Sequence, residues 1–464
     1  MDGFDVVVAG AGPPGEVAAG RCADGGLSVA IVEERLVGGE CSFYGCIPSK
    51  TLIRPGDVLA AARRVPGAAE AITGPIDIEA AFAQRDHMTS FWDDSGQVPW
   101  LDSEGIELVR GHGRLAGERT VEVELADGSG TRRLSARRAV VLAIGTSSAM
   151  PPIEGLADAG AWDNVDITSA KEVPRRLLVL GGGAIGVEMA QCFKRLGSEE
   201  VTVLEGGPRL LGREEPFAGE ELAKAFEAEG ISVLTNARMS AVMREARDRP
   251  VTATLEDGRS FEGDEILVAV GRRPRTGDAG LETVGLEDLK GKFLEADERL
   301  RIGGTDWLYA VGDVNGKALL THMGKYQGRI VGDVILGKDV VDVADADKVP
   351  RVTFTDPQVA AVGLTEEQAR EKGIDVRVVS YDTGGVAGAY TRGNDIHGTS
   401  QLVVDESRGV IVGATFTGPD VQELVHAATI AIIGGVTLDR LWHAVPSFPT
   451  VSEVWLRLLE AYGL

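Results

Sequence analysis

Cysteine is scarce in this chain of 464 residues, which contains only Cys22, Cys41, Cys46 and Cys192. Four cysteines in so long a chain do not make a disulfide framework. The first residues, MDGFD, are acidic and lead directly into a strand-like VVV, without the basic segment and apolar run of an export signal. We therefore expect a protein of the reducing cytoplasm.

Long apolar runs and an excess of basic residues are also lacking. The most apolar late stretch, residues 428–436, contains two glycines and is far shorter than the roughly 20 residues of a membrane helix. The chain has 47 Lys and Arg against 71 Asp and Glu, a net charge of −24. Such a charge repels nucleic acid and anionic membranes at long range, so we expect neither as a partner.

Glycine, by contrast, is abundant, at 61 of 464 residues. That is well above the usual share of about 7%, and the glycines show no collagen-like period of three. The length predicts two to four domains. The surplus glycine therefore needs a structural reason inside a globular, multidomain protein.

A strand, a glycine-rich turn and an alanine-rich helix occur twice, with the turns GAGPPG at residues 10–15 and GGGAIG at residues 181–186. In each copy a second strand follows and ends in a glutamate, Glu33 or Glu205. The glycines of such a unit form the tight turn, admit a diphosphate and let helix and strand pack closely. One copy is weak evidence, but two copies predict two dinucleotide sites, for a flavin and a nicotinamide. The strands expected around the turns cover residues 6–9, 28–32, 177–180 and 200–204.

Glu205 also bears on the choice of nicotinamide cofactor. A carboxylate at this strand end accepts hydrogen bonds from a ribose 2′-OH and repels a 2′-phosphate, which favours NADH over NADPH. Arg209 lies four residues further on and could reach a phosphate, but the intervening Gly-Gly-Pro leaves its direction open.

From about residue 343 the glycine turns disappear and strands alternate with helices, which predicts a further domain. Its clearest helix covers residues 421–433, where apolar residues recur every three or four positions. We expect this face to lie in the core, with a subunit interface as the alternative. The apolar positions are Val421, Leu424, Val425, Ala428 and Ile432. A strand followed by a loop is expected within residues 266–274, and later strands are expected at 307–311, 401–405 and 410–415.

Residues 38–50 read GGECSFYGCIPSK and are the most informative stretch of the chain. Pro48 suits the first turn of a helix, so Cys46 is expected at a helix N-terminus, where the dipole stabilises a thiolate. Lys50 follows one turn later. Cys41 and Cys46 could be unrelated or half of a metal site, but no other cysteine is near and zinc needs two more ligands. We therefore expect a redox pair and no metal.

This segment resembles the active-site motif of the class I flavoprotein disulfide reductases, the dihydrolipoamide dehydrogenase and glutathione reductase group. The similarity spans essentially the whole chain and includes AIGT at 143–146, GGGAIGVE at 181–188, VAVGRRP at 268–274, YAVGDV at 309–314 and FTDPQVAAVGLTEEQA at 354–369. It implies an α/β fold with two Rossmann-type dinucleotide-binding domains and an α+β C-terminal dimerisation domain that makes a homodimer. The implied segments are 1–148 (FAD), 149–271 (NAD(P)H), 272–342 (return to the FAD domain) and 343–464 (interface).

The resemblance also implies roles for individual residues. Cys46 would be the flavin-proximal, charge-transfer thiol, Cys41 the interchange thiol, and Lys50 would lie near flavin N5 and pair with Glu188. The implied FAD contacts are Gly10, Gly12, Gly15, Glu33, Gly39, Lys50, Gly113, Gly145, Asp313, Leu319, Leu320, Thr321 and His322. The implied NAD contacts are Gly181, Gly183, Ile185, Gly186, Glu205 and Gly271.

One position departs from the family pattern. Disulfide-reducing members carry HPTxSE near the C-terminus, whereas this chain reads FPTVSE from Phe448 to Glu453. Glu453, which in the family orients the histidine and completes the partner subunit's site, is retained. A phenyl ring cannot carry a proton, and general acid–base catalysis is typically worth about 10²–10⁴-fold. Rapid exchange with dihydrolipoamide is therefore not expected.

Several acceptors are compatible with this change. His443 could substitute, the acceptor could be a disulfide with a low-pKa leaving thiol, or flavin could reduce a quinone directly. We expect an FAD-dependent, NADH-preferring disulfide oxidoreductase, with a quinone reductase or diaphorase and a flavin-loaded sensor or interaction protein as alternatives. The chain lacks the C-terminal cysteine pair of mercuric and large thioredoxin reductases, and it retains the first cysteine that soluble transhydrogenases lack.

Overall fold

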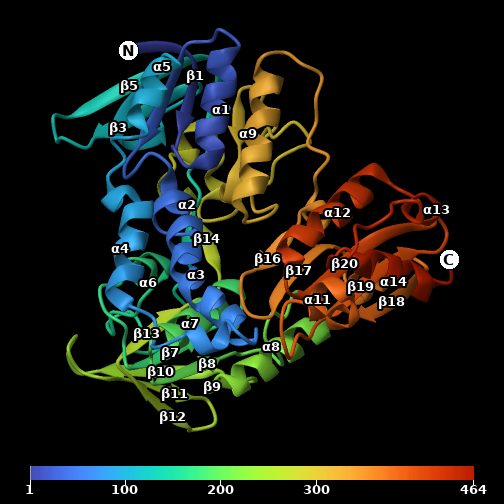
Figure 1. Ribbon diagram of the computed structural model, residues 1–464. Coiled ribbons are helices and arrows are strands. Elements are labelled where there is room, and N and C mark those ends of the chain that lie inside the picture. Colours follow the sequence, from blue (N-terminus) through green and yellow to red (C-terminus); the bar gives the residue numbers. More distant parts are fainter. Residues whose placement is uncertain (1) are drawn as a thin grey trace. The chain divides into compact units, whose positions relative to one another are not determined.

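The computed structural model describes residues 2–464, which form two compact units that the chain enters repeatedly (Figure 1). Unit 1 contains residues 2–48, 84–149 and 272–346, and unit 2 contains residues 49–83, 150–271 and 347–464. Helices α3 (Cys46–Arg63) and α4 (Ile78–Met88) connect the two. The first glycine turn therefore folds together with residues that lie more than 250 positions later in the chain.

Unit 1 is built on a six-stranded sheet with the order β1-β2-β3-β4-β5-β15, in which β1 also pairs with β5. The central strand β1 pairs in parallel on both sides, so that Val6 lies opposite Val29 and Ala139. Its VVVA run is buried on both faces, as expected for a central parallel strand. The strands are β1 (Asp2–Ala9), β2 (Val29–Glu33), β3 (Ile106–Leu115), β4 (Thr120–Leu125), β5 (Thr131–Leu142) and β15 (Leu308–Ala310), with β6 (Thr146–Ser148) and β14 (Arg272–Pro274) in a separate pair.

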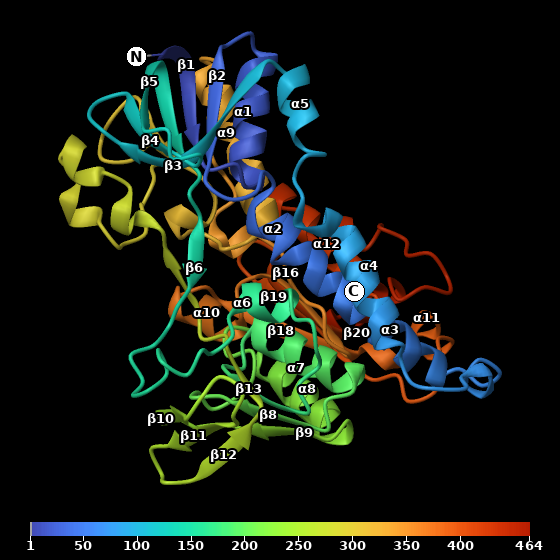
Figure 2. The same ribbon diagram turned by 90° about the vertical axis from the view of Figure 1, so that its left-hand side faces the viewer.

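Two helices of unit 1, α1 (Pro13–Asp24) and α9 (Thr321–Ile335), lie side by side in both views (Figures 1 and 2). A Cβ added to Gly328 would lie 2.7 Å from the carbonyl oxygen of Pro14, and one on Gly332 would lie 2.6 Å from Cβ of Arg21. Part of the glycine surplus therefore serves close helix packing. The shorter helices of unit 1 are α2 (Gly39–Phe43) and α5 (Val98–Ser103).

Unit 2 contains three sheets. The first is parallel, in the order β13-β7-β8-β9, and the second glycine turn directly follows its strand β7. Its strands are β7 (Arg176–Leu180), β8 (Glu200–Leu204), β9 (Ile231–Leu234) and β13 (Glu265–Val268). Beside them in sequence, β10 (Met239–Arg244), β11 (Val251–Leu255) and β12 (Ser260–Gly263) form an antiparallel sheet. Each glycine turn directly follows the first strand of a sheet whose neighbouring strands pair in parallel, β1 in unit 1 and β7 in unit 2, which confirms the predicted α/β class.

The third sheet of unit 2 is antiparallel, in the order β16-β17-β20-β19-β18. Its strands are β16 (Arg351–Thr353), β17 (Gln358–Gly363), β18 (Val376–Asp382), β19 (Thr399–Asp405) and β20 (Val410–Gly418). The helices of unit 2 are α6 (Asn164–Thr168), α7 (Ala184–Leu196), α8 (Pro216–Ala228), α10 (Glu366–Glu371), α11 (Ala387–Tyr390), α12 (Val421–Gly434), α13 (Leu438–Leu441) and α14 (Glu453–Tyr462).

Helix α12 tests the expected apolar face directly. Val421, Leu424, Val425 and Ala428 are buried in one cluster with the antiparallel sheet, which confirms the core interpretation, and Ile432 packs against that cluster while partly buried. Across residues 2–464 the structure contains no helix whose length and apolar character would allow it to cross a bilayer.

Candidate functional site

The two glycine turns have the same geometry. Gly10 and Gly181 have φ of 101° and 108°, a left-handed backbone that glycine adopts without strain. A Cβ on Gly15 or Gly186 would lie 1.9 or 2.0 Å from the carbonyl oxygen of the first glycine in its own turn. Only glycine at this third position lets the helix approach the turn so closely.

The glutamates that end the second strands are bound to these turns in the same way. Glu33 accepts hydrogen bonds from the amides of Ala11 and Arg35, both at 2.8 Å. Glu205 accepts from the amide of Gly182 at 2.6 Å and from the amide two residues after itself at 2.5 Å. Burial raises the pKa of Glu33, while its backbone hydrogen bonds oppose that shift. Each carboxylate is thus fixed beside a helix N-terminus, where a ribose hydroxyl would be recognised.

The space in front of both helices fits a diphosphate. Gly12 and Gly183 are the N-caps of α1 and α7, and neither helix has a side-chain cap. A Cβ on Gly183 would meet no heavy atom within 4 Å, and one on Gly12 only Cδ of Pro14 at 3.9 Å. The positive ends of the helix dipoles therefore face open space, a suitable place for phosphate oxygens. The residues present fit FAD at the first turn and a nicotinamide dinucleotide at the second.

The two cysteines of the GGECSFYGCIPSK segment lie together in unit 1. Helix α3 begins at Cys46, as Pro48 predicts, and Cys41 lies in α2. Both are thiols that hydrogen-bond each other, and Sγ of Cys46 is also 3.4 Å from Oγ1 of Thr321. The hydrogen bond to Cys46, together with burial, raises the pKa of the Cys41 thiol. Cys41 is therefore protonated at neutral pH and needs a base to become a nucleophile.

Lys50 lies one helical turn after Cys46 in the sequence of α3, and it forms the expected ion pair with Glu188 of α7. Its Nζ is 2.7 Å from Oε2 of Glu188. The other oxygen of Glu188 accepts from the amide of Phe354 at 2.9 Å, and the Lys50 ammonium stands 4.8 Å from the centroid of the Phe354 ring. The buried carboxylate thus holds the ammonium in one place. The position of the Lys50 ammonium beside a flavin stays a prediction.

Cys22 and Cys192 belong to the cores of α1 and α7, as expected from the sequence. Both are buried, and burial raises the pKa of each thiol to about 12. Because a thiol reacts through its thiolate, these two cysteines are poor nucleophiles.

Asp313 lies in a charged cluster of unit 1 that the sequence did not reveal. Oγ1 of Thr146 donates to Asp313 at 2.9 Å, and Nε of Arg272 donates to the same Oγ1 at 2.6 Å. Arg272 and Arg275 also form ion pairs with Glu40, the residue before Cys41. Burial raises the pKa of Asp313, opposed by the Thr146 hydrogen bond. The acidic residue inside GGEC and the arginines of GRRPR were the available signals, but their pairing depends on the fold.

The remaining expected FAD residues also lie in unit 1. Gly113 is in β3, where a Cβ would come within 2.9 Å of Cγ1 of Val32, so its glycine serves strand packing as well. Gly39 has a φ of 60° and packs on Gly12, and Gly145 has a φ of 66°. Leu319 and Leu320 directly precede α9, and Thr321 and His322 are its first two residues. Ile185 and Gly271, expected to contact NAD, are in unit 2, Ile185 in α7 and Gly271 just after β13.

The C-terminal motif places Phe448 on the surface, with 74% of the side chain exposed. Glu453, the first residue of α14, is buried and accepts from Arg457 at 2.7 Å and from the amide of Ala387 at 3.4 Å. His443 is also exposed. The carboxylate that orients a histidine in related enzymes is therefore bound to an arginine here.

Glu16, in the first turn of α1, should make stability depend on pH. Burial raises its pKa to about 7, Glu33 reinforces the shift and Lys325 opposes it. Because the folded state holds the proton more tightly, stability should fall as the pH rises from about 4.5 to about 7 and then level off. We expect the free energy of unfolding of Glu16→Gln to exceed that of the wild type by about 1–3 kcal/mol at pH 8 and to equal it at pH 4. Thermal unfolding midpoints at both pH values test this, and an equal difference at the two would contradict it.

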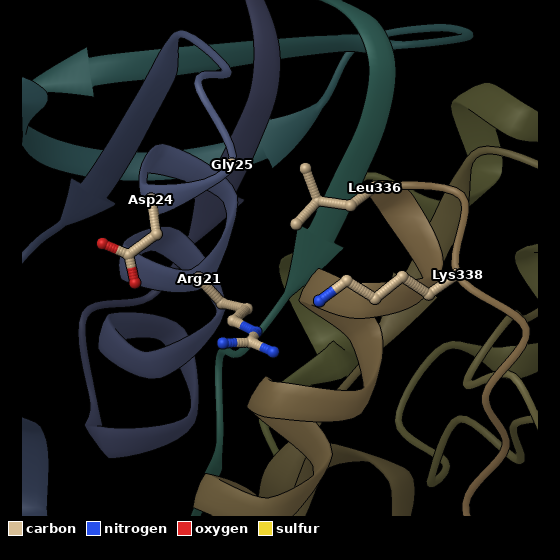
Figure 3. Close-up of a pocket in the computed structure, with 5 residues that line it drawn as sticks. All are labelled: Arg21, Asp24, Gly25, Leu336 and Lys338. Atoms are coloured by element: carbon tan, nitrogen blue, oxygen red, sulfur yellow. The ribbon is translucent and has the colours of Figure 1, made fainter.

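An open pocket of about 280 Å³ lies elsewhere in unit 1 (Figure 3). It is lined by Arg21, Asp24, Gly25, Leu336 and Lys338, at the C-terminal ends of α1 and α9. The glycine turn and Thr321 are at the N-terminal ends, about 18 Å away along a 12-residue helix. This pocket is therefore separate from the redox pair.

Comparison with known proteins extends these local observations to the whole chain. A dihydrolipoyl dehydrogenase from Mycobacterium tuberculosis (strain ATCC 25618 / H37Rv) is 33% identical over 98% of this chain and 97% of its own length. A mercuric reductase from Lysinibacillus sphaericus is 31% identical over 97% of this chain and 81% of its own length. The solved structure of the HOCl-induced flavoprotein disulfide reductase RclA from Escherichia coli matches with a TM-score of 0.85 and 26% identity, covering 98% of this chain and 99% of that one.

Two protein-family models match consecutive segments that together cover nearly all of the chain. The pyridine nucleotide-disulphide oxidoreductase model matches residues 4–328, which include both glycine turns and the cysteine pair, and the dimerisation-domain model of the same family matches residues 349–458. The chain therefore belongs to the pyridine nucleotide-disulphide oxidoreductases, as an FAD-dependent enzyme that forms a homodimer.

Proposed function

We propose that this enzyme passes electrons from NADH through FAD to a Cys41–Cys46 disulfide, and from the resulting dithiol to a disulfide acceptor. The observation that carries the proposal is the hydrogen-bonded pair of Cys41 and Cys46 next to Thr321. The proposed division is an FAD domain in 1–148 and 272–342, a nicotinamide domain in 149–271 and an interface domain in 343–464. The few cysteines support a cytoplasmic enzyme.

The chemistry of the chain's own residues is thiol–disulfide exchange. FAD, when bound, supplies an electron pair taken as hydride from NADH. The Cys41–Cys46 disulfide accepts two electrons and two protons and becomes two thiols. The Cys41 thiolate then attacks one sulfur of the acceptor disulfide, forms a mixed disulfide and releases the first thiol. The Cys46 thiolate attacks the Cys41 sulfur, restores the internal disulfide and releases the second thiol.

Phe448 narrows the class of acceptor. The raised pKa of Cys41 means that its proton must be removed, and Phe448 provides no group that takes it. An acceptor disulfide whose leaving thiol has a low pKa is least affected by the lack of an acid–base group at position 448. Such a thiol departs as the thiolate and needs no proton donor. His443 is the alternative base. In the homodimer we place Phe448 and Glu453 against the partner subunit's redox pair.

Direct reduction of a quinone is the second candidate, and exposed apolar side chains favour it. Val445 is 87% exposed and Phe448 74%, and Trp442 is also exposed. In the proposed homodimer these side chains would lie beside the partner subunit's redox pair, where a flat, apolar acceptor would find matching surface, and its reduction needs no base at Cys41.

The nicotinamide preference rests on Glu205 and Arg209. Glu205 keeps its carboxylate at the end of β8, where a 2′-phosphate would be repelled. The Arg209 guanidinium donates to the carbonyl oxygens of Gly212 and Glu214, both at 3.1 Å. Because those bonds engage the Arg209 guanidinium within its own loop, we favour NADH.

An acceptor screen on the wild type and Cys41→Ser tests the proposal. Lipoamide, small disulfides with low-pKa thiols, and quinones would each be offered with NADH and with NADPH. We expect a low-pKa disulfide to be reduced by the wild type with NADH, and its turnover to be lost in Cys41→Ser. Quinone turnover that is faster than any disulfide turnover and unchanged in Cys41→Ser would make the disulfide route secondary.

A further inference from the structure

Three consecutive residues after α4 adopt a left-handed backbone. Ser90, Phe91 and Trp92 have φ of 49°, 55° and 57°, and the turn is closed by a bond from the Trp92 amide to the carbonyl oxygen of Thr89 at 2.9 Å. A residue with a Cβ is unfavourable in this region and stays there only where surrounding contacts hold it. The contacts of this turn therefore indicate what it is for.

The indole of Trp92 is directed at the redox segment. Its Nε1 donates to the carbonyl oxygen of Phe43 at 3.1 Å. Phe43 is the last residue of α2 and lies between Cys41 and Cys46 in the sequence. The last carbonyls of a helix have no partner within it, so Trp92 supplies one from outside. On the indole, the guanidinium of the fully buried Arg85 lies 5.4 Å from the ring centroid.

Asp94 fixes the other end of the same segment. Its Oδ2 accepts from the amide of Val37 at 2.6 Å and from Arg110 at 2.7 Å. Val37 directly precedes Gly38, the N-cap of α2. The same Nη1 of Arg110 reaches the carbonyl oxygen of Arg35 at 3.1 Å. Asp94 is buried, so this bond is shielded from water.

From these contacts we propose that Trp92 and Asp94 are positioning residues that hold α2, and with it Cys41, within disulfide-forming reach of Cys46. The inference rests on the proposed redox role of this pair. A disulfide forms only when its two Cα atoms lie about 4.4–6.8 Å apart in a suitable orientation. A segment held at both ends keeps Cys41 there, which favours the disulfide over the dithiol. Releasing one end allows α2 to move and shifts the equilibrium toward the dithiol.

The equilibrium to be measured is the exchange of the Cys41–Cys46 disulfide with two glutathione thiols, which yields the protein dithiol and one glutathione disulfide. FAD-loaded enzyme is equilibrated in glutathione buffers, trapped with an alkylating agent and analysed by mass spectrometry. We expect Trp92→Phe, which keeps an aromatic ring on Arg85 but loses the N–H, to lower the tendency to form the disulfide by about 3- to 10-fold. If Trp92 had only a structural role, Trp92→Phe would change the unfolding midpoint but leave the equilibrium constant for exchange with glutathione unchanged.

Two further variants make the test decisive. Trp100→Phe alters another tryptophan of unit 1, which packs on Gly20 of α1, and should leave the constant at the wild-type value. Asp94→Asn keeps an acceptor for the Val37 amide but removes the charge that pairs with Arg110. If Trp92→Phe does not fold, the glutathione equilibrium of Asp94→Asn tests the proposal in its place. We expect Asp94→Asn to shift the equilibrium toward the dithiol by less than Trp92→Phe.

A wild type that forms no Cys41–Cys46 disulfide would overturn this inference and the proposed function together. Variants that match a disulfide-forming wild type would overturn the inference alone.

Discussion

Replacing Phe448 by histidine should increase the rate at which a small disulfide is reduced by about 10²-fold. The pKa of Cys41 is raised, so its thiol is protonated at neutral pH and the attack on an acceptor awaits removal of that proton. A histidine at 448 supplies a base, and Glu453 lies five residues on to orient it. Because Glu453 is bound by Arg457, we place the gain at the lower end of the range for acid–base catalysis. Steady-state rates with NADH and a small disulfide measure it.

The matched control for this change is Phe448→Ala, which removes the phenyl ring without adding a base. A histidine acting as a base should also give a rate that rises with pH around its ordinary pKa of about 6.5, a feature absent from the alanine variant. If the two variants have equal rates and flat pH profiles, position 448 does not reach the redox pair in the dimer. If His443 is the base instead, His443→Ala should slow disulfide reduction. A faster rate in that variant would contradict this alternative.

Replacing Cys46 by serine should reduce disulfide turnover by roughly 1000-fold or more, because no internal disulfide can then form. The long-wavelength charge-transfer absorbance expected on reduction with NADH should disappear at the same time. Stopped-flow absorbance records both results in one experiment. Quinone turnover, if it occurs directly from flavin, should survive.

Cys192→Ala is the control for a general effect of losing a cysteine. Cys192 is buried in α7 with its pKa raised to about 12, so its removal should lower stability and leave the absorbance and turnover in place. A Cys46→Ser enzyme that still reduces disulfides would show that these electrons bypass the pair.

The local elements could be read from the sequence because each depends on neighbouring residues. The buried VVVA run predicted β1, and the chain is extended over Asp2–Ala9. The glycine turns predicted two strand–turn–helix units, and both are present with a glutamate bound to the turn. The apolar spacing in residues 421–433 predicted α12, which is found at Val421–Gly434. Strand ends were less accurate, since the strand expected at 307–311 is β15 at Leu308–Ala310.

Contacts between distant residues were not readable in the same way, except where a family pattern linked them. That resemblance predicts the pairing of Lys50 with Glu188, and Nζ of Lys50 lies 2.7 Å from Oε2 of Glu188. The pairing of Glu40 with Arg272, 232 positions away, was not expected. Nor was the bond from Trp92 to Phe43, because nothing in the spacing of a tryptophan and a carbonyl indicates that they meet.

The sequence by itself therefore determined the class of enzyme: two glycine turns for two dinucleotides, a cysteine pair at a helix start, and Phe448 where a base is expected. These features are local, since a tight turn, a helix dipole or a phenyl ring acts through residues close in the chain. The tertiary structure decided which groups surround the reactive pair. It placed the half-buried Cys41 against Cys46 and raised its pKa, buried Glu453, and directed Trp92 and Asp94 at the two ends of α2. Burial and long-range hydrogen bonding are properties of the folded chain, and they set the reactivity of residues whose identity the sequence had already supplied.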